Sequence, residues 1–103
     1  MIDTIKTLGF EVYAQLRCSG IVKKGDFPAL INKLWEYSEL KKNDKNIVKY
    51  DVEILFSLYT RLSNEIYMYI KPETDSELGK YFIAFELLIE KIFSPSSIFI
   101  NDL

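Results

Sequence analysis

Apolar side chains between Asp51 and Ile70 recur at three- and four-residue steps, and this periodicity is the strongest constraint on the fold. The row consists of Leu55, Leu58, Tyr59, Leu62, Ile66, Tyr69 and Ile70. An α-helix turns once in about 3.6 residues, so these side chains share one face. We therefore predict a helix over residues 51–70. It ends at Lys71-Pro72, because the residue before a proline is displaced from the helical conformation.

Three other segments have the same periodicity, at residues 3–19, 27–40 and 75–94. Their apolar rows are, in chain order, Ile5, Leu8, Val12 and Leu16; Phe27, Leu30, Ile31, Leu34 and Trp35; and Leu78, Phe82, Phe85, Ile89 and Ile92. Four apolar faces on four helices must bury one another, which defines a helical bundle. We predict that residues 1–103 form a single all-α domain, a compact bundle of about four main antiparallel helices.

Residues at the segment ends predict where the helices begin and end. Side-chain oxygens that can accept a bond from a free backbone N–H are expected to act as N-caps. They belong to Asp3, Asp26, Asp51 and Thr74, the last in a reciprocal capping pair with Glu77. Ser19-Gly20 and Pro95 mark helix ends. The β-branched pair Ile47-Val48 leaves two readings open, a short extended piece or an extra turn before the helix.

The end of the chain contains the consecutive apolar residues Ile98, Phe99 and Ile100. Large apolar side chains in such a run are costly to leave in water, so we expect this C-terminal tail to pack back on the bundle. A short strand is the alternative. The longest predicted helix, over residues 51–70, contains several ionised side chains, so no membrane span is expected.

The sequence contains no histidine and a single cysteine, Cys18. This composition removes the usual general base at neutral pH, the Ser-His and Cys-His nucleophile pairs and the commonest metal ligand. We therefore expect no enzyme activity, no cofactor and no metal. Cys18 is expected to be a buried small hydrophobe. A lone thiol, with no secretory signal at the N-terminus, indicates a cytoplasmic protein.

Charge is distributed unevenly along the chain. Residues 1–50 contain nine Lys/Arg and six Asp/Glu, a balance of +3, whereas residues 51–103 contain four and nine, a balance of −5. An acidic half repels nucleic acid and attracts basic partners. Arginine, on which phosphate and base recognition depends heavily, occurs only twice, so no direct nucleic-acid partner is expected. Ordinary solvation of the surface is the alternative reading of the acidic half.

The acidic half also contains the candidate partner-binding residues. They are Asp51, Glu53, Glu65, Tyr67, Glu73, Asp75, Glu77, Glu86 and Glu90. Glu86 and Glu90 are four residues apart and so share one flank of the last predicted helix. Tyr67 and Phe56 point away from the apolar row of residues 51–70. They are either covered by the C-terminal tail or exposed as anchors for a partner, because aromatic side chains are enriched at the centres of interfaces.

In size, helix content and this acidic and aromatic set of residues, the chain resembles the small helical immunity proteins of bacteria. Those families protect cells against toxins of contact-dependent growth inhibition and against nuclease bacteriocins. The resemblance covers the whole chain as a general pattern and includes no single motif. It implies an inhibitor that binds a cognate toxin domain, typically a basic nuclease, and blocks its active site by steric occlusion and acidic charge mimicry. The alternative is another non-enzymatic interaction module, such as a homo-oligomeric adaptor or a phage accessory protein.

Overall fold

The computed structural model describes residues 1–44, 46–69 and 76–93, and this part of the chain contains four α-helices and no strand. The helices are α1 (Ile2–Ser19), α2 (Asp26–Lys41), α3 (Lys49–Tyr69) and α4 (Glu77–Phe93). Each begins and ends within two residues of its predicted range, so the all-α fold class is confirmed. The predicted helix end at Pro72, the Thr74 cap and the packing of the C-terminal tail lie outside the described residues.

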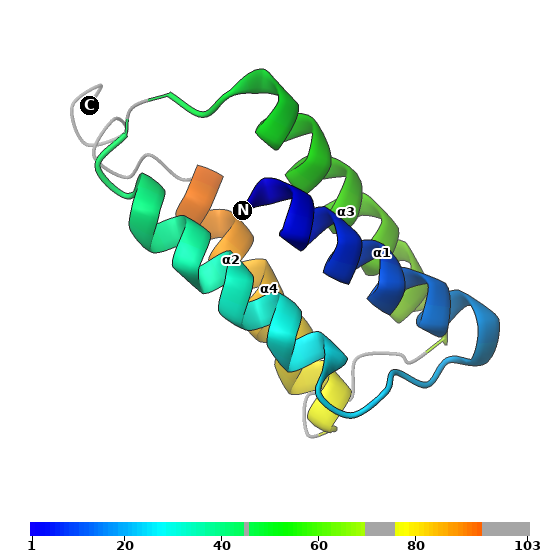
Figure 1. Ribbon diagram of the computed structural model, residues 1–103. Helices are drawn as coiled ribbons and strands as arrows, with labels where there is room; N and C mark the ends of the chain where they lie inside the picture. The colour runs from blue at the N-terminus through cyan, green and yellow to red at the C-terminus, as the bar shows by residue number, and fades with distance from the viewer. Residues whose placement is uncertain (45, 70–75, 94–103) are drawn as a thin grey trace.

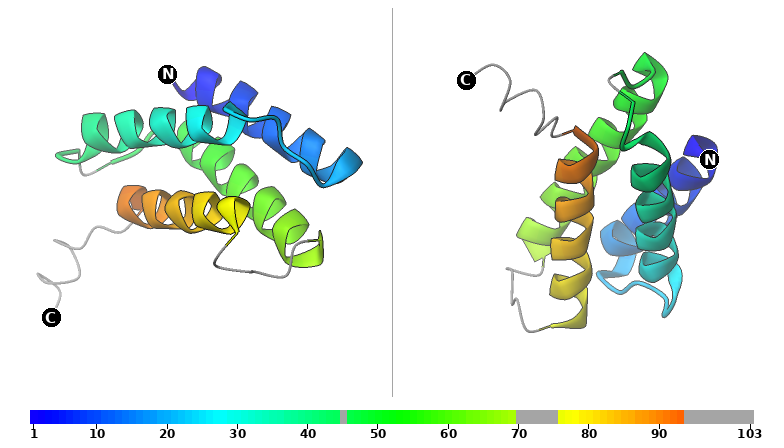
Figure 2. Two further views of the ribbon diagram at one scale, coloured as in Figure 1. Left: turned by 90° about the horizontal axis from the view of Figure 1, so that it is seen from below. Right: turned by 90° about the vertical axis from the view of Figure 1, so that its left-hand side faces the viewer.

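Successive helices of the bundle run in opposite directions, as the short connections predicted (Figure 1). α1 packs against α2 and α3, and α2 also packs against α4, whereas the contact between α3 and α4 is less extensive. The pairs α1–α4 and α2–α3 lie on the diagonals of the bundle. The side-by-side helices α1 and α3 therefore point the same way, and so do α2 and α4 (Figures 1 and 2).

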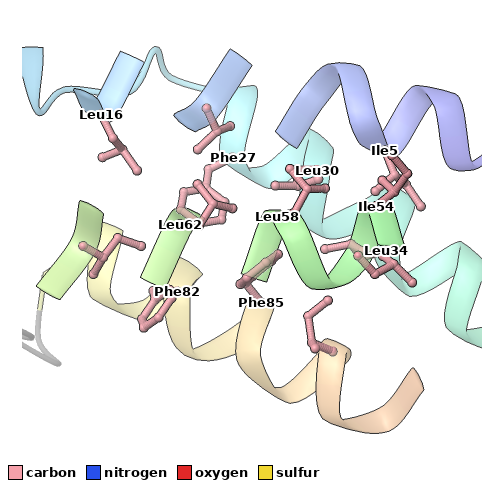
Figure 3. Packing of buried hydrophobic residues seen from close by; sticks show 14 of the residues in the cluster. Ile5, Leu16, Phe27, Leu30, Leu34, Ile54, Leu58, Leu62, Phe82 and Phe85 are labelled. Carbon is pink, nitrogen blue, oxygen red and sulfur yellow. The ribbon is translucent and has the colours of Figure 1, made fainter. Parts of the chain in front are cut away.

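The core is a single cluster of apolar side chains from all four helices. It contains Ile5, Val12, Leu16, Phe27, Leu30, Leu34, Tyr37, Ile54, Leu55, Leu58, Leu62, Ile66, Phe82, Phe85 and Ile89. Figure 3 shows 14 of these side chains at successive levels along the bundle, with Leu16 and Phe82 at one end and Ile5 and Leu34 at the other. The helical periodicity therefore predicted most of the core.

Aromatic rings join α4 to its two neighbours. The ring of Phe85 lies 6.4 Å from the ring of Phe27 on α2, in an edge-on arrangement, and 6.3 Å from the ring of Tyr59 on α3, in a stacked one. Phe82 stacks on Phe85 at 6.3 Å. Both geometries are favourable for aromatic pairs. Phe85 thus contacts both neighbours of α4 with one ring.

The predicted aspartate N-caps are wrong, because these carboxylates bond elsewhere or lie inside the helix. α1 and α2 begin after Met1 and Gly25, without a side-chain capping bond. Asp26 instead accepts a hydrogen bond from Gln15 Nε2 at 2.7 Å. Asp51 lies within the first turn of α3, since Val52 N–H donates to the Val48 carbonyl and the helix begins earlier than expected.

Two other helix ends follow the capping rules. Gly20 terminates α1 in the left-handed conformation (φ 72°), which favours glycine, and its N–H donates to the Leu16 carbonyl. Ser76 caps the start of α4, because its Oγ accepts the Gly79 N–H at 2.9 Å. The stop at Gly20 is confirmed, whereas α4 begins two residues later than predicted.

Two side chains predicted to be buried are exposed. Trp35 is 53% exposed and Cys18 is also exposed. Each residue along a helix is rotated by about 100° from the one before it. Trp35 therefore lies to one side of the buried Leu34, and Cys18, two residues after the buried Leu16, points away from the core.

Gly9 of α1 leaves room for Leu58 of α3, and the sequence did not indicate this contact. The residue is buried, and a Cβ placed on it would lie 2.5 Å from Leu58 Cδ2 and 2.7 Å from Leu58 Cδ1. Such distances are shorter than van der Waals contact, so a side chain at position 9 requires Leu58 to move. Gly9 therefore lets the two helices pack against each other at the centre of the core.

We expect Gly9→Ala to lower the free energy of unfolding by about 1 kcal/mol. Alanine gains about 1 kcal/mol in helix propensity, but overpacking a core costs about 1–3 kcal/mol. In a Leu58→Ala background the added methyl group enters freed space, so the same substitution should be stabilising. Urea denaturation of the four chains measures both effects. An equal effect of Gly9→Ala in the two backgrounds would contradict the close contact.

Candidate functional site

The outward side of α3 carries a row of exposed residues that we call the α3 outer stripe. It consists of Glu53, Phe56, Thr60 and Tyr67. Their three-, four- and seven-residue spacing places them on one side of the helix. Phe56 is 65% exposed and Tyr67 is 55% exposed. No described residue covers these two aromatic side chains, and the alternative of coverage by the C-terminal tail concerns residues outside the described ranges.

Tyr67 is the more fixed of the two aromatic residues. Its ring lies 5.9 Å from the ring of Phe82 on α4, at an interplanar angle of 88°. Such an edge-on contact holds the exposed ring in one orientation. Phe56 has no ring partner among the residues that the structure describes. The stripe thus has one aromatic residue held against α4 and another more open to solvent.

Two carboxylates of α4 lie beside this stripe. Glu86 is four residues after Phe82, so it lies one turn further along the side of α4 that contacts Tyr67. Glu90 follows one turn later. Because α3 and α4 run in opposite directions, this row leads back along α3 toward Phe56. Glu86 is half-buried, Glu90 is exposed, and neither has an ion-pair partner in the described part of the chain.

Glu65 is not part of this accessible surface, because it lies inside the fold and is only 6% exposed. One carboxylate oxygen, Oε1, is 3.3 Å from a guanidinium nitrogen of Arg17 on α1. The other, Oε2, is buried without a hydrogen-bond partner among the described residues. Burying a carboxylate requires a partner to offset the loss of hydration, and Arg17 supplies it. Glu65 therefore links α3 to α1.

Asp51 is also occupied within the fold. Its Oδ2 accepts a hydrogen bond from the Tyr37 hydroxyl on α2 at 2.7 Å. Burial of Tyr37 and this bond to a carboxylate raise the pKa of Tyr37 well above its ordinary value, so the phenol remains a donor. The bond connects α2 with α3 across the diagonal of the bundle. Asp51 therefore has a clear structural role.

The remaining predicted acidic residues lie near the start of α4. Glu77 is exposed, and it accepts a hydrogen bond from the Tyr81 hydroxyl at 2.9 Å, which raises the pKa of Tyr81. Glu73 and Asp75 lie outside the described residues. Of the predicted set, Glu53, Tyr67, Glu86 and Glu90 thus lie on the outer side of α3 and α4.

The sequence interpretation missed exposed apolar residues on α2 and α4. Trp35, Ile83 and Leu87 all have large exposed fractions. A signal for Ile83 and Leu87 was present, because α4 contains the apolar runs Tyr81–Phe85 and Leu87–Ile89, separated by Glu86 alone. Five consecutive apolar residues extend around the whole circumference of a helix, so some of them must face outward. No comparable signal marked Trp35, which had been assigned to the core.

Between α2 and α4, charged groups bridge the surface. Glu39 of α2 is 2.8 Å from Lys91 Nζ of α4 and 3.1 Å from Lys42 Nζ. The hydrogen bonds from Lys91 and then Lys42 lower the pKa of Glu39. These cations are therefore engaged with a carboxylate of the same chain.

Neither a metal cluster nor a membrane-spanning helix occurs in the described part of the chain. Within residues 1–44, 46–69 and 76–93, no three Cys, Asp or Glu side chains gather closely enough to hold a metal ion. No helix there combines the length and the apolar character needed to cross a bilayer. We take the α3 outer stripe with Glu86 and Glu90 as the candidate site, because its aromatic side chains are exposed beside carboxylates.

Comparison of the chain with protein-family models, with curated proteins and with solved structures gave no match.

We expect Tyr37→Phe to lower the free energy of unfolding by about 1–2 kcal/mol, because it leaves the Asp51 carboxylate without its donor. In an Asp51→Ala background the same substitution should cost much less, and a double-mutant cycle measured by urea denaturation gives the coupling. Tyr67→Phe is the matched control, since it removes an exposed hydroxyl, and it should change stability by less than about 0.5 kcal/mol. Additive effects at positions 37 and 51 would show that the bond does not stabilise the fold.

Proposed function

We propose that this protein is an immunity-type inhibitor that binds a basic toxin domain through the α3 outer stripe and the neighbouring carboxylates of α4. The observation that carries the proposal is the exposure of two aromatic rings, Phe56 and Tyr67, beside acidic side chains on a helical scaffold. A partner that covers this surface gains apolar burial and charge pairing together.

The aromatic residues supply the affinity in this proposal. Interfaces are dominated by a few large side chains that become fully buried near the centre, and aromatic residues are frequent among them. Tyr67 suits this role because its contact with Phe82 already fixes the ring, which reduces the entropy lost on binding. Phe56 exposes more of its surface and so has more to gain from being covered.

The carboxylates supply attraction toward a basic partner. Glu53 lies on the stripe itself, and Glu86 and Glu90 lie beside it on α4. Arg61, the only arginine of α3, is turned toward α1, where its guanidinium lies 5.4 Å from the ring centre of Phe10 and 5.5 Å from that of Tyr13. The stripe itself therefore contains carboxylate but no cation. Such a surface accelerates association with a basic protein at low ionic strength.

Inhibition follows from where the surface binds. A nuclease active site that holds phosphate is lined by cations, and the carboxylates of α3 and α4 occupy that cleft in place of the phosphate groups. The helical bundle then blocks access of nucleic acid to the cleft. The mechanism requires no cofactor and no chemical step in the inhibitor. We place it in the cytoplasm, where the exposed Cys18 would remain reduced.

The test is growth of a host that expresses the candidate toxin domain encoded beside the gene for this chain. Coexpression of this chain should restore growth, and the two purified proteins should form a stable complex in which the nuclease is inactive. A catalytically inactive toxin variant that still binds separates complex formation from loss of activity. Failure to protect the host, together with the absence of a complex, would overturn the proposed function.

Within such a complex we expect Glu53→Lys to lower the association rate constant about tenfold at low salt, with little effect at high salt. Glu11→Lys is the matched control, because Glu11 is exposed on α1 and the change in net charge is the same. Stopped-flow fluorescence measures both rates. Equal slowing by the two variants would show that net charge alone, and not the α3 outer stripe, governs association.

A further inference from the structure

The side of α4 that faces away from the core carries a second row of exposed residues, which we call the α4 seam. It consists of Lys80, Ile83, Leu87 and Glu90. Their three-, four- and three-residue spacing is that of the inward positions of a coiled-coil heptad. Ile83 and Leu87 are 40% and 59% exposed and occupy the middle of the row, with one charge of each sign at its ends.

No described helix covers the α4 seam. The helices that pack against α4 are α2 and α3, and Figure 2 (left) shows α4 at the edge of the bundle with no described helix below it. A helix that is apolar around its whole circumference is normally buried on all sides. The apolar run Tyr81–Phe85 gives α4 this character. The uncovered seam is therefore the part of α4 that lacks a packing partner.

The charges at the ends of the seam do not stabilise α4 by themselves. Lys80 is the fourth residue of the helix and Glu90 is the fourth from its end. A helix favours negative charge near its N-terminus and positive charge near its C-terminus, which is the reverse of this placement. Neither residue has an ion-pair partner among the described residues. Ion pairs with another protein chain would account for the placement of both charges.

We propose that the α4 seam is a dimer interface that pairs with the same seam of a second copy in antiparallel orientation. A two-fold axis beside Phe85 places Ile83 opposite Leu87 of the second copy, and Leu87 opposite its Ile83. The same axis places Lys80 opposite Glu90 of the second copy, and this ion pair occurs twice by symmetry. Apolar contacts thus lie at the centre and two ion pairs lie at the rim.

Alternative occupants satisfy the seam less well. A parallel arrangement of two copies would bring Lys80 against Lys80 and Glu90 against Glu90, which is repulsive at both ends. The chain's own C-terminal residues 94–103 contain one acidic side chain, Asp102, and no basic one. That segment offers a partner for Lys80 but none for Glu90. Only the antiparallel second copy provides opposite charges at both ends.

The interface is small, and this determines how the dimer should behave. α4 has 17 residues, so at about 1.5 Å per residue it is about 25 Å long. One helix of this length buries less than the roughly 1,200–2,000 Å² typical of stable complexes. We therefore expect a reversible dimer with a dissociation constant on the order of micromolar. The α4 seam shares Glu90 with the carboxylates of the proposed toxin surface but no residue with the α3 outer stripe, so dimerisation is tested on this chain alone and its failure does not bear on the stripe.

The test is sedimentation equilibrium of the full chain over about 1–500 µM, a range that brackets the expected dissociation constant. Lys80→Glu and Glu90→Lys should each weaken dimerisation about tenfold or more, because each converts two attractive pairs into two repulsive ones. The double variant, with the charges exchanged, should dimerise as the original chain does. An equimolar mixture of the two single variants should also dimerise, since every pair is then of opposite sign.

Folding of these variants is monitored by the helical circular-dichroism signal. It should be retained, because each substitution places the new charge at the end of α4 that favours it. A chain that stays monomeric over the whole range would overturn the proposal, including the case in which residues 94–103 cover the seam. A dimer that is unaffected by the single variants, or not restored by the double variant, would place the interface elsewhere.

Discussion

The position of α4 depends on the packing of Phe85. This one ring contacts Phe27 of α2 and Tyr59 of α3, and Phe82 stacks against it. The contact between α3 and α4 is otherwise less extensive than the other helix contacts, so aromatic packing provides much of what holds these two helices together. The α4 seam lies on this helix, and so do Glu86 and Glu90 beside the α3 outer stripe. The placement of the two surfaces relative to each other therefore rests on a residue that belongs to neither.

The two surfaces arise from the way the bundle is assembled. α1 is held by two neighbours over its length, and its exposed side is largely polar. α4 occupies the opposite corner, and it has more apolar surface than α2 and α3 can cover. The uncovered apolar surface is concentrated at Ile83 and Leu87, next to the acidic side chains of the same helix. An exposed apolar patch of this kind is typical of a surface that binds another protein.

The sequence predicted the features that depend on one helix at a time. Helical periodicity alone located the four helices and nearly all of the core. In any amphipathic helix, the apolar side chains recur at three- and four-residue steps. Features that depend on two helices were not predictable in this way. Gly9 accommodates Leu58, Asp51 accepts the bond from Tyr37, and Glu65 pairs with Arg17 only after the helices have come together. For the same reason Glu53, Tyr67 and Glu86 were recognised as candidates, but their common location was not.

The bond between Tyr37 and Asp51 has a practical consequence for the connection from α2 to α3. It fastens the two helices on either side of that connection, so the distance between the ends is set by the core and not by the intervening residues. The entropy of closing a loop increases only slowly with its length. An added peptide, such as an epitope or an acceptor for a fluorescent dye, should therefore be tolerated there.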